Sequence, residues 1–236
     1  MTIVSLFILG LLVGSFLNVL MYRLPRGEQF VAGHSRCPHC GHELAWYDLL
    51  PVISYLMLRA RCRYCHARIS VQYPIIELVS GLFFVLGHSV VAIIFLEVFL
   101  VIAVIDYQHL IIPDSLLVVL GIVGIVDGVS RTDVYSALVA GGFFFLLWLV
   151  SRGRWIGFGD VKLAGAIGLV FGFPGTLAII YGAVIIGGLL GVILLSLKKA
   201  TMKTALPFGT LLSLCAGIYI LFQDPILEVL ASLSFW

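Results

Sequence analysis

The sequence predicts an all-α, polytopic membrane protein of about eight transmembrane helices, with a small cytoplasmic zinc-binding-type domain between helices 1 and 2. Three observations support this fold class. Of the 236 residues, 61% are apolar and only 11% are charged, and the mean hydropathy is +1.16. A soluble core of this length could not bury so many apolar residues. The apolar residues form runs of membrane-spanning length, and one polar segment between them contains four of the five cysteines.

The first apolar run, residues 2–22, is close to the roughly 20 residues that cross the hydrocarbon core of a bilayer. No Lys or Arg precedes this run, no small-residue cleavage site follows it, and Arg23 and Arg26 come directly after it. A cleaved signal peptide has basic residues before its apolar run and a cleavage site after it. We therefore expect residues 1–22 to form an uncleaved first transmembrane helix with its N-terminus outside the cytoplasm.

The polar segment that follows, residues 23–72, is the only stretch long enough to form a small domain outside the membrane. Half of the fourteen Lys and Arg residues lie in it: Arg23, Arg26, Arg36, Arg59, Arg61, Arg63 and Arg68. Basic residues next to a transmembrane helix favour the cytoplasmic side. The segment is therefore expected to be a cytoplasmic domain, and residues 73–236 a membrane-embedded domain.

Seven further apolar runs are expected to be transmembrane helices: residues 73–87, 89–105, 111–126, 134–150, 161–173, 176–197 and 205–222. The first two are short, and they form two crossings only if the chain turns at residues 87–89. With that turn, thirteen of the fourteen basic residues lie in the cytoplasm, Arg131 being the exception. The positive-inside rule expects this asymmetry, so charge favours eight crossings.

This topology places Asp106, Asp114 and Asp160 at helix ends on the cytoplasmic face. Asp106 follows a long apolar stretch, and a carboxylate there is costly unless it reaches the headgroups or serves a site. Asp114 follows Pro113 and is expected to cap the next helix. Asp160, directly before V-K-L-A-G-A, is also expected to be a helix cap that suits the helix dipole.

Two glycines add a further interpretation of Asp160. In G-F-G-D, Gly157 and Gly159 carry no side chain, so an extended backbone could lie against this loop. Asp106 is 54 residues away, and only the fold can bring the two carboxyl groups together. Two close carboxyl groups share a proton, so that one acts as base and the other as acid, as in aspartyl proteases. The sequence permits this pair without proving it.

The cysteines form a second pattern in the polar segment. The pairs Cys37-x-x-Cys40 and Cys62-x-x-Cys65 are separated by 21 residues, close to the spacing of four-cysteine zinc sites. Reducing cytoplasmic conditions disfavour disulfides, which leaves structural zinc, the interpretation we favour, or free and redox-active thiols. The histidines nearby could replace a ligand, but solvent exposure is the simpler expectation for them: His34, His39, His42 and His66.

Several ordered blocks of the sequence resemble one known family, the type IV prepilin peptidases, whose G-x-G-D element also occurs in presenilin-like enzymes. These blocks are G-S-F-L-N-V-L-M-Y-R-L-P, C-P-H-C, D-L-L-P-V-I-S-Y-L, R-C-R-Y-C, I-S-V-Q-Y-P-I-I-E-L, D-Y-Q-H-L-I-I-P-D, G-F-G-D-V-K-L and P-F-G. They run from Gly14 to Gly209, nearly the whole chain. The resemblance implies an aspartyl endopeptidase of the bacterial inner membrane, with Asp106 and Asp160 as its catalytic residues at the cytoplasmic face.

The same resemblance implies substrates and a second activity. Such enzymes remove the basic leader of prepilins or pseudopilins, and many then methylate the new N-terminus with S-adenosylmethionine. No glycine-rich nucleotide-binding turn identifies a site for this methyl donor. The chain also departs from the family at Ala60, where glycine is common in a segment associated with methylation. No nucleic-acid partner is implied, and neither the particular pilin, its use in motility, secretion or competence, nor the oligomeric state is predicted.

Other residues are expected to support the site. Gly157 and Gly159 would give room to substrate. Lys162 could lower the pKa of Asp160, or it could bind substrate or membrane lipid headgroups. Glu77 could line a polar cleft or cap the helix entered at Pro74. Two other function classes stay open: an ion-coupled transporter, and a zinc-clamped scaffold of pilus assembly without enzymatic activity.

Overall fold

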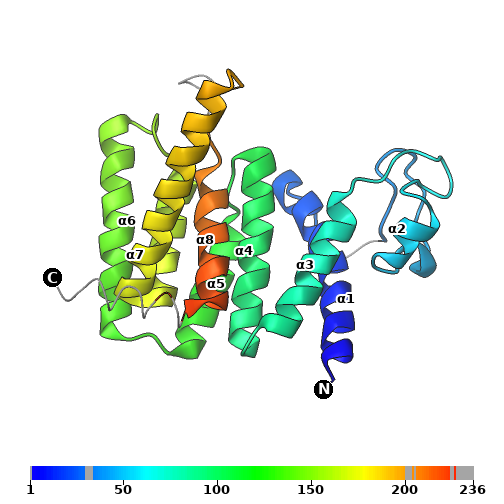
Figure 1. Cartoon of the computed structure of the whole chain (residues 1–236), viewed down its shortest axis with the longest axis horizontal. Helices are drawn as coiled ribbons and strands as arrows, with labels where there is room; N and C mark the ends of the chain where they lie inside the picture. Colours follow the sequence, from blue (N-terminus) through cyan, green and yellow to red (C-terminus); the bar gives the residue numbers. More distant parts are fainter. Residues whose placement is uncertain (1, 30–33, 200–203, 205, 224–225, 227–236) are drawn as a thin grey trace. The chain divides into compact units, whose positions relative to one another are not determined.

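The computed structural model describes residues 2–29, 34–199, 204, 206–223 and 226 (Figure 1). Throughout these ranges the regular elements are helices, and backbone pairing between extended segments is limited to two isolated β-bridges. The chain divides into two compact units, Met1–Ile93 and Ile94–Trp236. The all-α prediction is confirmed for the part of the chain that the structure describes. Lys203, one of the basic residues assigned to the cytoplasm, lies outside the described residues.

The first unit is built on two helices in close contact, α1 (Ile3–Arg23) and α3 (Gln72–Leu86). A methyl group added at Gly10 would lie 2.7 Å from the Cα atom of Gly81, so a side chain there would force the helices apart. Across the same contact, the Ser80 hydroxyl donates a 2.7 Å hydrogen bond to the Gly10 carbonyl oxygen. Small residues and interhelical hydrogen bonds are common means of pairing helices in a bilayer.

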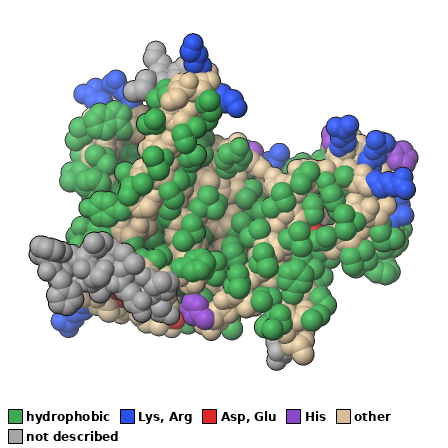
Figure 2. All heavy atoms as spheres, viewed as in Figure 1, with side chains coloured by type: hydrophobic (Ala, Val, Ile, Leu, Met, Phe, Trp, Pro, Cys, Tyr) green, Lys and Arg blue, Asp and Glu red, His purple; other side chains and the backbone are tan. Residues whose placement is uncertain are grey.

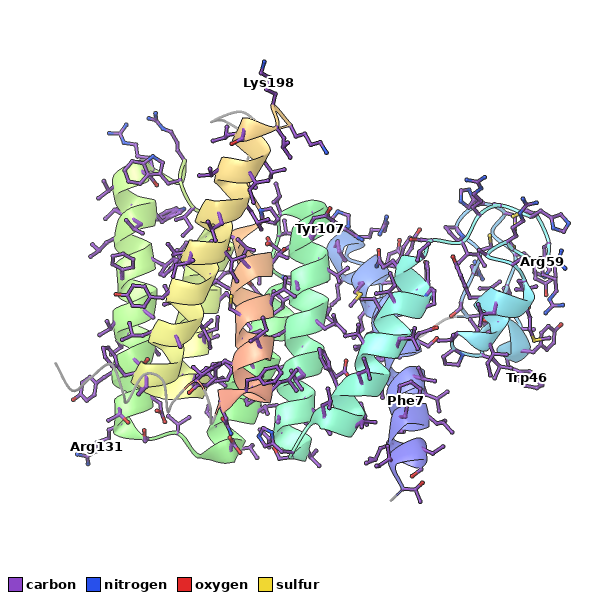
Figure 3. All side chains as sticks on the ribbon, viewed as in Figure 1. Phe7, Trp46, Arg59, Tyr107, Arg131 and Lys198 are labelled. Carbon is purple, nitrogen blue, oxygen red and sulfur yellow. The ribbon has the colours of Figure 1, made fainter. Side chains whose placement is uncertain are left out.

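The polar segment between these helices contains only short elements: η1 (Leu24–Arg26), η2 (Trp46–Asp48) and α2 (Ile53–Met57). Most of it is turns and extended backbone. Lys and Arg side chains gather on its surface (Figure 2), and Trp46 and Arg59 both point outward from it (Figure 3). A segment with so little regular structure needs another source of stability, and its four cysteines are candidates to provide it.

The second unit begins at Ile94, inside α4 (Val90–His109). It also contains four further helices: α5 (Asp114–Gly128), α6 (Arg131–Ser151), α7 (Phe158–Ser196) and α8 (Phe208–Leu221). Helix α7 packs against α5, α6 and α8. Phe99, Ile102 and Ile105 of α4 are at most 1% exposed. Helix α4 is therefore covered by its neighbours along the stretch that leads to Asp106.

Helix α7 reverses direction at Gly172, whose dihedrals (φ 62°, ψ −173°) are not helical. Before the break, Gly168 lies against the backbone of Ala137, and after it the Thr176 hydroxyl lies 3.1 Å from that of Ser136. Residues 168 and 176 thus meet adjacent positions of α6, which a straight helix could not achieve. The break agrees with the prediction of two apolar runs, 161–173 and 176–197.

The predicted number of membrane crossings, eight, is larger than the number that the helix lengths alone support. Among the described residues, four helices are long and apolar enough to cross a bilayer: Ile3–Arg26, Val90–His109, Arg131–Ser151 and Phe158–Ser196. Three shorter apolar helices, α3, α5 and α8, have 14 or 15 residues each. Apolar side chains cover the visible faces of α6 and α7, with Lys and Arg toward the helix ends (Figure 2). The structure thus agrees with a polytopic membrane protein, and the count of eight stays a prediction.

Candidate functional site

Asp106 lies near the C-terminal end of α4 and is only 4% exposed. Its Oδ2 atom accepts a 2.6 Å hydrogen bond from the backbone N–H of Thr210, at the beginning of α8. The Thr210 hydroxyl lies 3.0 Å from the same oxygen and 3.0 Å from the carbonyl oxygen of Ala103. A single threonine therefore fixes the orientation of the Asp106 carboxyl group.

Asp160 is the third residue of α7 and is 9% exposed. Its Oδ2 atom accepts a 3.1 Å hydrogen bond from the backbone N–H of Gly157, the residue that precedes the helix. The expectation that Asp160 itself is the N-cap is wrong, because the helix begins two residues earlier, at Phe158. Its carboxylate still satisfies one of the unpaired N–H groups of the helix N-terminus from inside the first turn.

The beginning of α8 brings the two aspartates to one place. Thr210 donates to Asp106, and the neighbouring N–H of Gly209 interacts with the carboxylate of Asp160. The two carboxyl groups are close enough for their charges to interact. Two residues that are 54 positions apart in the sequence therefore share one buried polar site. The fold provides the proximity of Asp106 and Asp160 that the sequence alone could not show.

Two glycines and one isoleucine set the spacing around this site. A methyl group on Gly209 would lie 3.0 Å from Cγ of Asp106 and 2.8 Å from Cδ1 of Ile112. Ile112, in the loop between α4 and α5, also lies 3.2 Å from the position of a methyl group on Gly159. Gly159 therefore allows close packing against this loop. Gly157 instead contributes its N–H to Asp160.

Lys162 forms an ion pair with Asp114, the first residue of α5. Its ammonium group also lies 5.5 Å from the ring centroid of Phe158. The ion pair joins the beginning of α5 to the beginning of α7. Lys162 therefore stabilises the structure near the site by pairing with Asp114 and not with Asp160. Asp114 begins its helix instead of capping it, because the N-cap is Pro113.

Sequence reasoning missed Gly209, Thr210 and Ile112 as residues of this site. P-F-G was noted as a block of the family, but neither a glycine nor a threonine has chemistry that marks it as functional. A backbone N–H donor is present at every residue except proline, so sequence alone cannot show which one reaches a carboxylate. The only signal was the position of P-F-G at the start of an apolar run.

Glu77 belongs to the first unit and is 6% exposed. It is the sixth residue of α3, beyond the first turn, so the helix-cap interpretation is not supported. Its Oε2 atom accepts a 2.7 Å hydrogen bond from the N–H of Val52, and the Ser15 hydroxyl also interacts with its carboxylate. Val52 has a φ of 62°, which is strained for a β-branched residue, so Glu77 stabilises an unfavourable turn.

The four predicted cysteine ligands come together in the polar segment. The sulfur atoms of Cys37, Cys40, Cys62 and Cys65 all lie within 4.8 Å of one another, and those of Cys37 and Cys65 are 3.8 Å apart. A tetrahedral ion with metal–sulfur bonds of ~2.3 Å requires sulfur separations of about 3.8 Å. All four are free thiols, so this group could hold a metal ion such as zinc. The nearby histidines are outside the cluster.

Two similar hairpins present these thiols. In the first, the N–H of Cys37 donates to the His42 carbonyl oxygen at 3.0 Å, and in the second that of Cys62 donates to the Ala67 oxygen at 2.8 Å. The β-bridges Arg36–Glu43 and Arg61–Arg68 close them. Each C-x-x-C therefore sits in a turn that directs both of its sulfurs to one side.

The backbone also favours metal-binding chemistry at Cys37. Burial raises the pKa of the Cys37 thiol, but the N–H groups of Cys40 and His39 and the neighbouring thiols outweigh burial and lower it to about 7. At Cys65 the N–H of Ala67 lowers the pKa, while burial and the other thiols raise it to about 11. One thiolate thus forms readily near neutral pH, and thiolates are the metal-binding form of cysteine.

The second hairpin contains the departure from the family at Ala60. Ala60 has a φ of 58°, in the left-handed region that favours glycine, and its N–H and carbonyl bond to Tyr55 and Ile69. Its conformation is therefore fixed by hydrogen bonds on both sides. A left-handed φ at this position gives a structural reason for the glycine that is common there in the family.

Comparisons with known proteins cover most of the chain. Residues 8–93 match the bacterial peptidase A24 N-terminal domain, and residues 90–192 match the type IV leader peptidase family. Among the relatives is a prepilin leader peptidase/N-methyltransferase of Stutzerimonas stutzeri, 32% identical over 93% of this chain and 90% of the relative.

A protein of the same description from Pseudomonas putida is 33% identical over 93% of this chain and 90% of its own length. One from Myxococcus xanthus is 36% identical over 81% of this chain, which spans 63% of that protein. No solved structure matches the chain.

Proposed function

Because the chain belongs to the type IV leader peptidase family, we propose that it is a membrane aspartyl endopeptidase that cleaves prepilins or pseudopilins at the end of their leader peptides. One observation carries this proposal: Asp106 and Asp160, on different helices, are both buried and are held by consecutive residues of α8. Their shared environment suits a pair of carboxyl groups that titrate as one unit.

The geometry suits hydrolysis of a peptide bond. With one proton between them, the ionised carboxylate removes a proton from a water molecule while the protonated carboxyl group donates a hydrogen bond to the scissile carbonyl oxygen. The water oxygen then forms a bond to the carbonyl carbon, and breaking the carbon–nitrogen bond releases the amine, which takes up the proton. Asp106 and Asp160 are the proposed acid and base. The room expected for substrate at Gly159 is instead filled by Ile112, and that at Gly157 by the Asp160 carboxylate, each 3.2 Å from where a methyl group would be.

Charge supports a cytoplasmic location for this reaction. Tyr107 and Lys198 lie at one end of the second unit and Arg131 at the other (Figure 3). Helix α6 runs from Arg131 toward Arg152 and Arg154, so these basic residues are also at the end opposite Arg131. The positive-inside rule then assigns the aspartates to the cytoplasmic face of a bacterial inner membrane.

The division into three segments also stays a proposal. We infer a first transmembrane helix at 1–22, a cytoplasmic domain at 23–72 and an eight-crossing protein overall, with the peptidase chemistry within 73–236. The close packing of α1 on α3 supports a polar segment anchored at both ends to paired helices.

We further infer that the cysteine cluster binds zinc. Four thiolates in tetrahedral reach suit zinc and leave no open coordination position, so the ion is structural. The ion would join two hairpins that lie in a segment of little regular structure.

The names of the relatives support a second reaction, methylation of the amine that cleavage releases. S-adenosylmethionine supplies a methyl group attached to a sulfonium, which becomes a neutral thioether as the amine gains the methyl group and loses a proton. The residues of this chain would have to hold a cationic nucleoside where the cleaved pilin can reach it.

The peptidase proposal is tested with the purified full chain in lipid nanodiscs and a prepilin substrate. We expect Asp106→Asn and Asp160→Asn each to lower the cleavage rate at least about a thousand-fold, because neither amide can transfer the proton. Asp127→Asn, at an exposed position on α5, is the matched control and should cleave like the wild type. Cleavage that survives both substitutions would contradict the aspartate pair as the catalytic groups, whereas wild-type protein that does not cleave would favour a scaffold or a transporter.

A further inference from the structure

The polar segment carries a group of large apolar side chains on its surface that the proposed chemistry does not use. Helix α2 lies against η2. The most exposed large apolar side chains of these two elements, which we call the apolar patch, are Trp46, Ile53, Leu56 and Met57, and they are 54–77% exposed. The three residues of α2 follow the i, i+3, i+4 spacing of one helix face. Exposed clusters of this kind mark surfaces that contact another protein or a membrane.

A basic pocket adjoins the apolar patch at Met57. It is an open pocket of about 480 Å³, lined mainly by Met57, Leu58, Arg59, Arg61, Arg63 and His66. Arg63 forms an ion pair with Asp48 at 2.7 Å. Arg59 and Arg61 form no ion pair with any residue that the structure describes. Two guanidinium groups that lack a carboxylate partner beside one pocket suit a phosphate group, which arginine binds in a bidentate manner.

The apolar patch and the basic pocket are ordered along the direction of α1. Within the first unit, Trp46 lies toward the end of α1 that carries Phe7, and Arg59 lies toward the other end (Figure 3). In the same view, Lys and Arg side chains gather along one edge of the polar segment and hydrophobic side chains lie below them (Figure 2). Under the topology proposed above, the N-terminal part of α1 is inside the bilayer. The side of the polar segment that carries Trp46 therefore faces the membrane.

We propose that the polar segment docks on the cytoplasmic surface of the bilayer, with the apolar patch inserted at the level of the headgroups and the basic pocket bound to the phosphate of an anionic phospholipid. This inference rests on the proposed topology and goes beyond the proposed reactions. Tryptophan is enriched at the membrane–water interface, and the anionic lipids of the cytoplasmic leaflet attract basic residues. Burial of apolar side chains and attraction of the arginines add to each other in such contacts.

Charge favours lipid over the substrate as the occupant of this surface. The leader that the family resemblance implies for a prepilin is basic, so it has the same charge as Arg59 and Arg61 and is repelled by them. An anionic phospholipid has the opposite charge. The chemistry of the pocket therefore selects a lipid headgroup.

Docking needs little intrinsic affinity, because the segment is attached at both ends. It leaves α1 at Arg23 and enters α3 at Gln72. Attachment makes the lipid contact an intramolecular event with a high effective concentration. One arginine near an anionic membrane surface changes a binding constant about five-fold, and two change it about twenty-five-fold. Two arginines are therefore enough to decide between a docked and an undocked segment.

The test is quenching of Trp46 fluorescence in the full-length, zinc-loaded protein in nanodiscs whose phospholipids are brominated on their acyl chains. The chain has four tryptophans, so the emission of Trp46 is taken as the difference between wild type and Trp46→Phe. We expect stronger quenching when the nanodiscs contain phosphatidylglycerol than when they contain phosphatidylcholine alone at equal bromine content. Trp46 emission that is unquenched in the anionic nanodiscs would overturn the proposal, and equal quenching in both lipids would refute the phosphate contact.

Removal of the two arginine charges tests the basic pocket directly. Arg59→Gln combined with Arg61→Gln should lower the ratio of docked to undocked segment about twenty-five-fold in the anionic nanodiscs and remove the difference between the two lipid compositions. Arg131→Gln is the matched control, because Arg131 is exposed and is expected outside the cytoplasm, and it should not change the quenching. Unchanged quenching in the double variant would contradict the proposal.

A second variant keeps the proposal falsifiable if the double variant loses its zinc. Leu56→Asp is outside both cysteine hairpins and at an exposed position. It should reduce quenching of Trp46 in both lipid compositions, because a carboxylate is costly to transfer out of water. Zinc content, measured in parallel, shows that the hairpins are intact in each variant. Quenching of Trp46 that is unaffected by Leu56→Asp would show that the apolar patch does not insert.

Failure of this inference is distinguishable from failure of the proposed function. Wild-type protein that cleaves prepilin while its Trp46 emission is unquenched would overturn docking and leave the function intact. Wild-type protein that does not cleave would contradict the function itself. Trp46 emission that changes only when prepilin is added would assign the apolar patch to the substrate, and would also overturn the proposal.

Discussion

At the scale of single residues, the site depends on a position that has no side chain. Gly209 lies between Asp106 and Ile112, and a methyl group there would be 3.0 Å from Cγ of the aspartate and 2.8 Å from Cδ1 of the isoleucine. Both distances are too short for carbon atoms in contact. The adjacent Thr210 then donates its N–H to Asp106. The pair Gly209–Thr210 therefore acts as a spacer that positions a carboxyl group.

We expect Gly209→Ala to lower the cleavage rate at least about ten-fold, because the added methyl group displaces Asp106 from its donors, and small misplacement of reacting groups is costly. The measurement is cleavage of prepilin by the nanodisc protein, with thermal unfolding recorded in parallel. Gly217→Ala lies in the same helix, where the nearest atom, Cδ2 of Leu96, is 3.8 Å away, and should remain active. A Gly209→Ala protein with wild-type cleavage would contradict the spacer role.

A second residue-scale effect concerns Ala60, whose φ of 58° is unfavourable for any residue with a side chain. Replacing it with glycine should stabilise the second cysteine hairpin by up to about 1 kcal/mol, less the entropy that glycine adds to the unfolded chain. The measurement is the rate at which bound zinc passes to a chelator, which should slow severalfold. Ala67→Gly, in the same hairpin at ordinary φ, should give no such gain. Faster zinc loss from Ala60→Gly would show that the strain is unimportant.

At the scale of elements, the reversal of α7 at Gly172 turns the half of the helix that follows it back alongside α6 and lets that half also pack on α8. Gly172 makes this possible, because its dihedrals lie in a region open essentially to glycine alone. Asp133 of α6 lies close to it, with Oδ1 2.7 Å from where a methyl group would be. Both the backbone and the space therefore require glycine.

Gly172→Ala should lower the free energy of unfolding by about 1–3 kcal/mol, the usual cost of a residue in a sparsely populated backbone region. Gly142→Ala is the control, because it is helical and no atom lies within 4 Å of the added methyl group. Thermal unfolding in matched nanodiscs measures both. An unchanged Gly172→Ala protein would mean that α7 can relax without cost.

The elements themselves were largely predictable from the sequence. The apolar runs at 73–87, 89–105 and 134–150 match α3, α4 and α6 within four residues at each end, because hydrophobicity marks buried or lipid-facing helices directly. The expected helix caps were wrong, since Asp114 and Asp160 lie inside α5 and α7. Cap residues favour a helix terminus, but the exact boundary depends on backbone geometry that a sequence pattern does not determine.

The site was predictable only where the chemistry resides in side chains. Asp106, Asp160 and the four cysteines were found because carboxylates at membrane helix ends and paired thiols are uncommon without a purpose. Gly209 and Thr210 were missed because their contribution is a backbone donor and an absence of bulk.

At the scale of the whole molecule, the two units have different sources of stability. In the second unit, α4 to α8 bury large apolar side chains such as Phe99, Leu163 and Leu212. In the first unit, the described part of the polar segment consists mainly of turns and two hairpins, and many of its large apolar side chains are exposed, including Trp46, Ile53 and Leu56. A segment of this kind relies on a cross-link, and the thiol cluster is the element that can provide it.

Removal of the metal should therefore disorder one segment and spare the rest. In Cys37→Ser we expect zinc content to fall and amide hydrogen exchange to accelerate across residues 34–72, while α4 to α8 keep their protection, because metal binding is linked to folding of the segment that provides the ligands. Cys215→Ala removes a thiol from α8, outside the cluster, and should change neither zinc content nor exchange in residues 34–72. Exchange in that segment that stays slow in metal-free protein would mean that the hydrogen bonds of the two hairpins suffice to hold it without an ion.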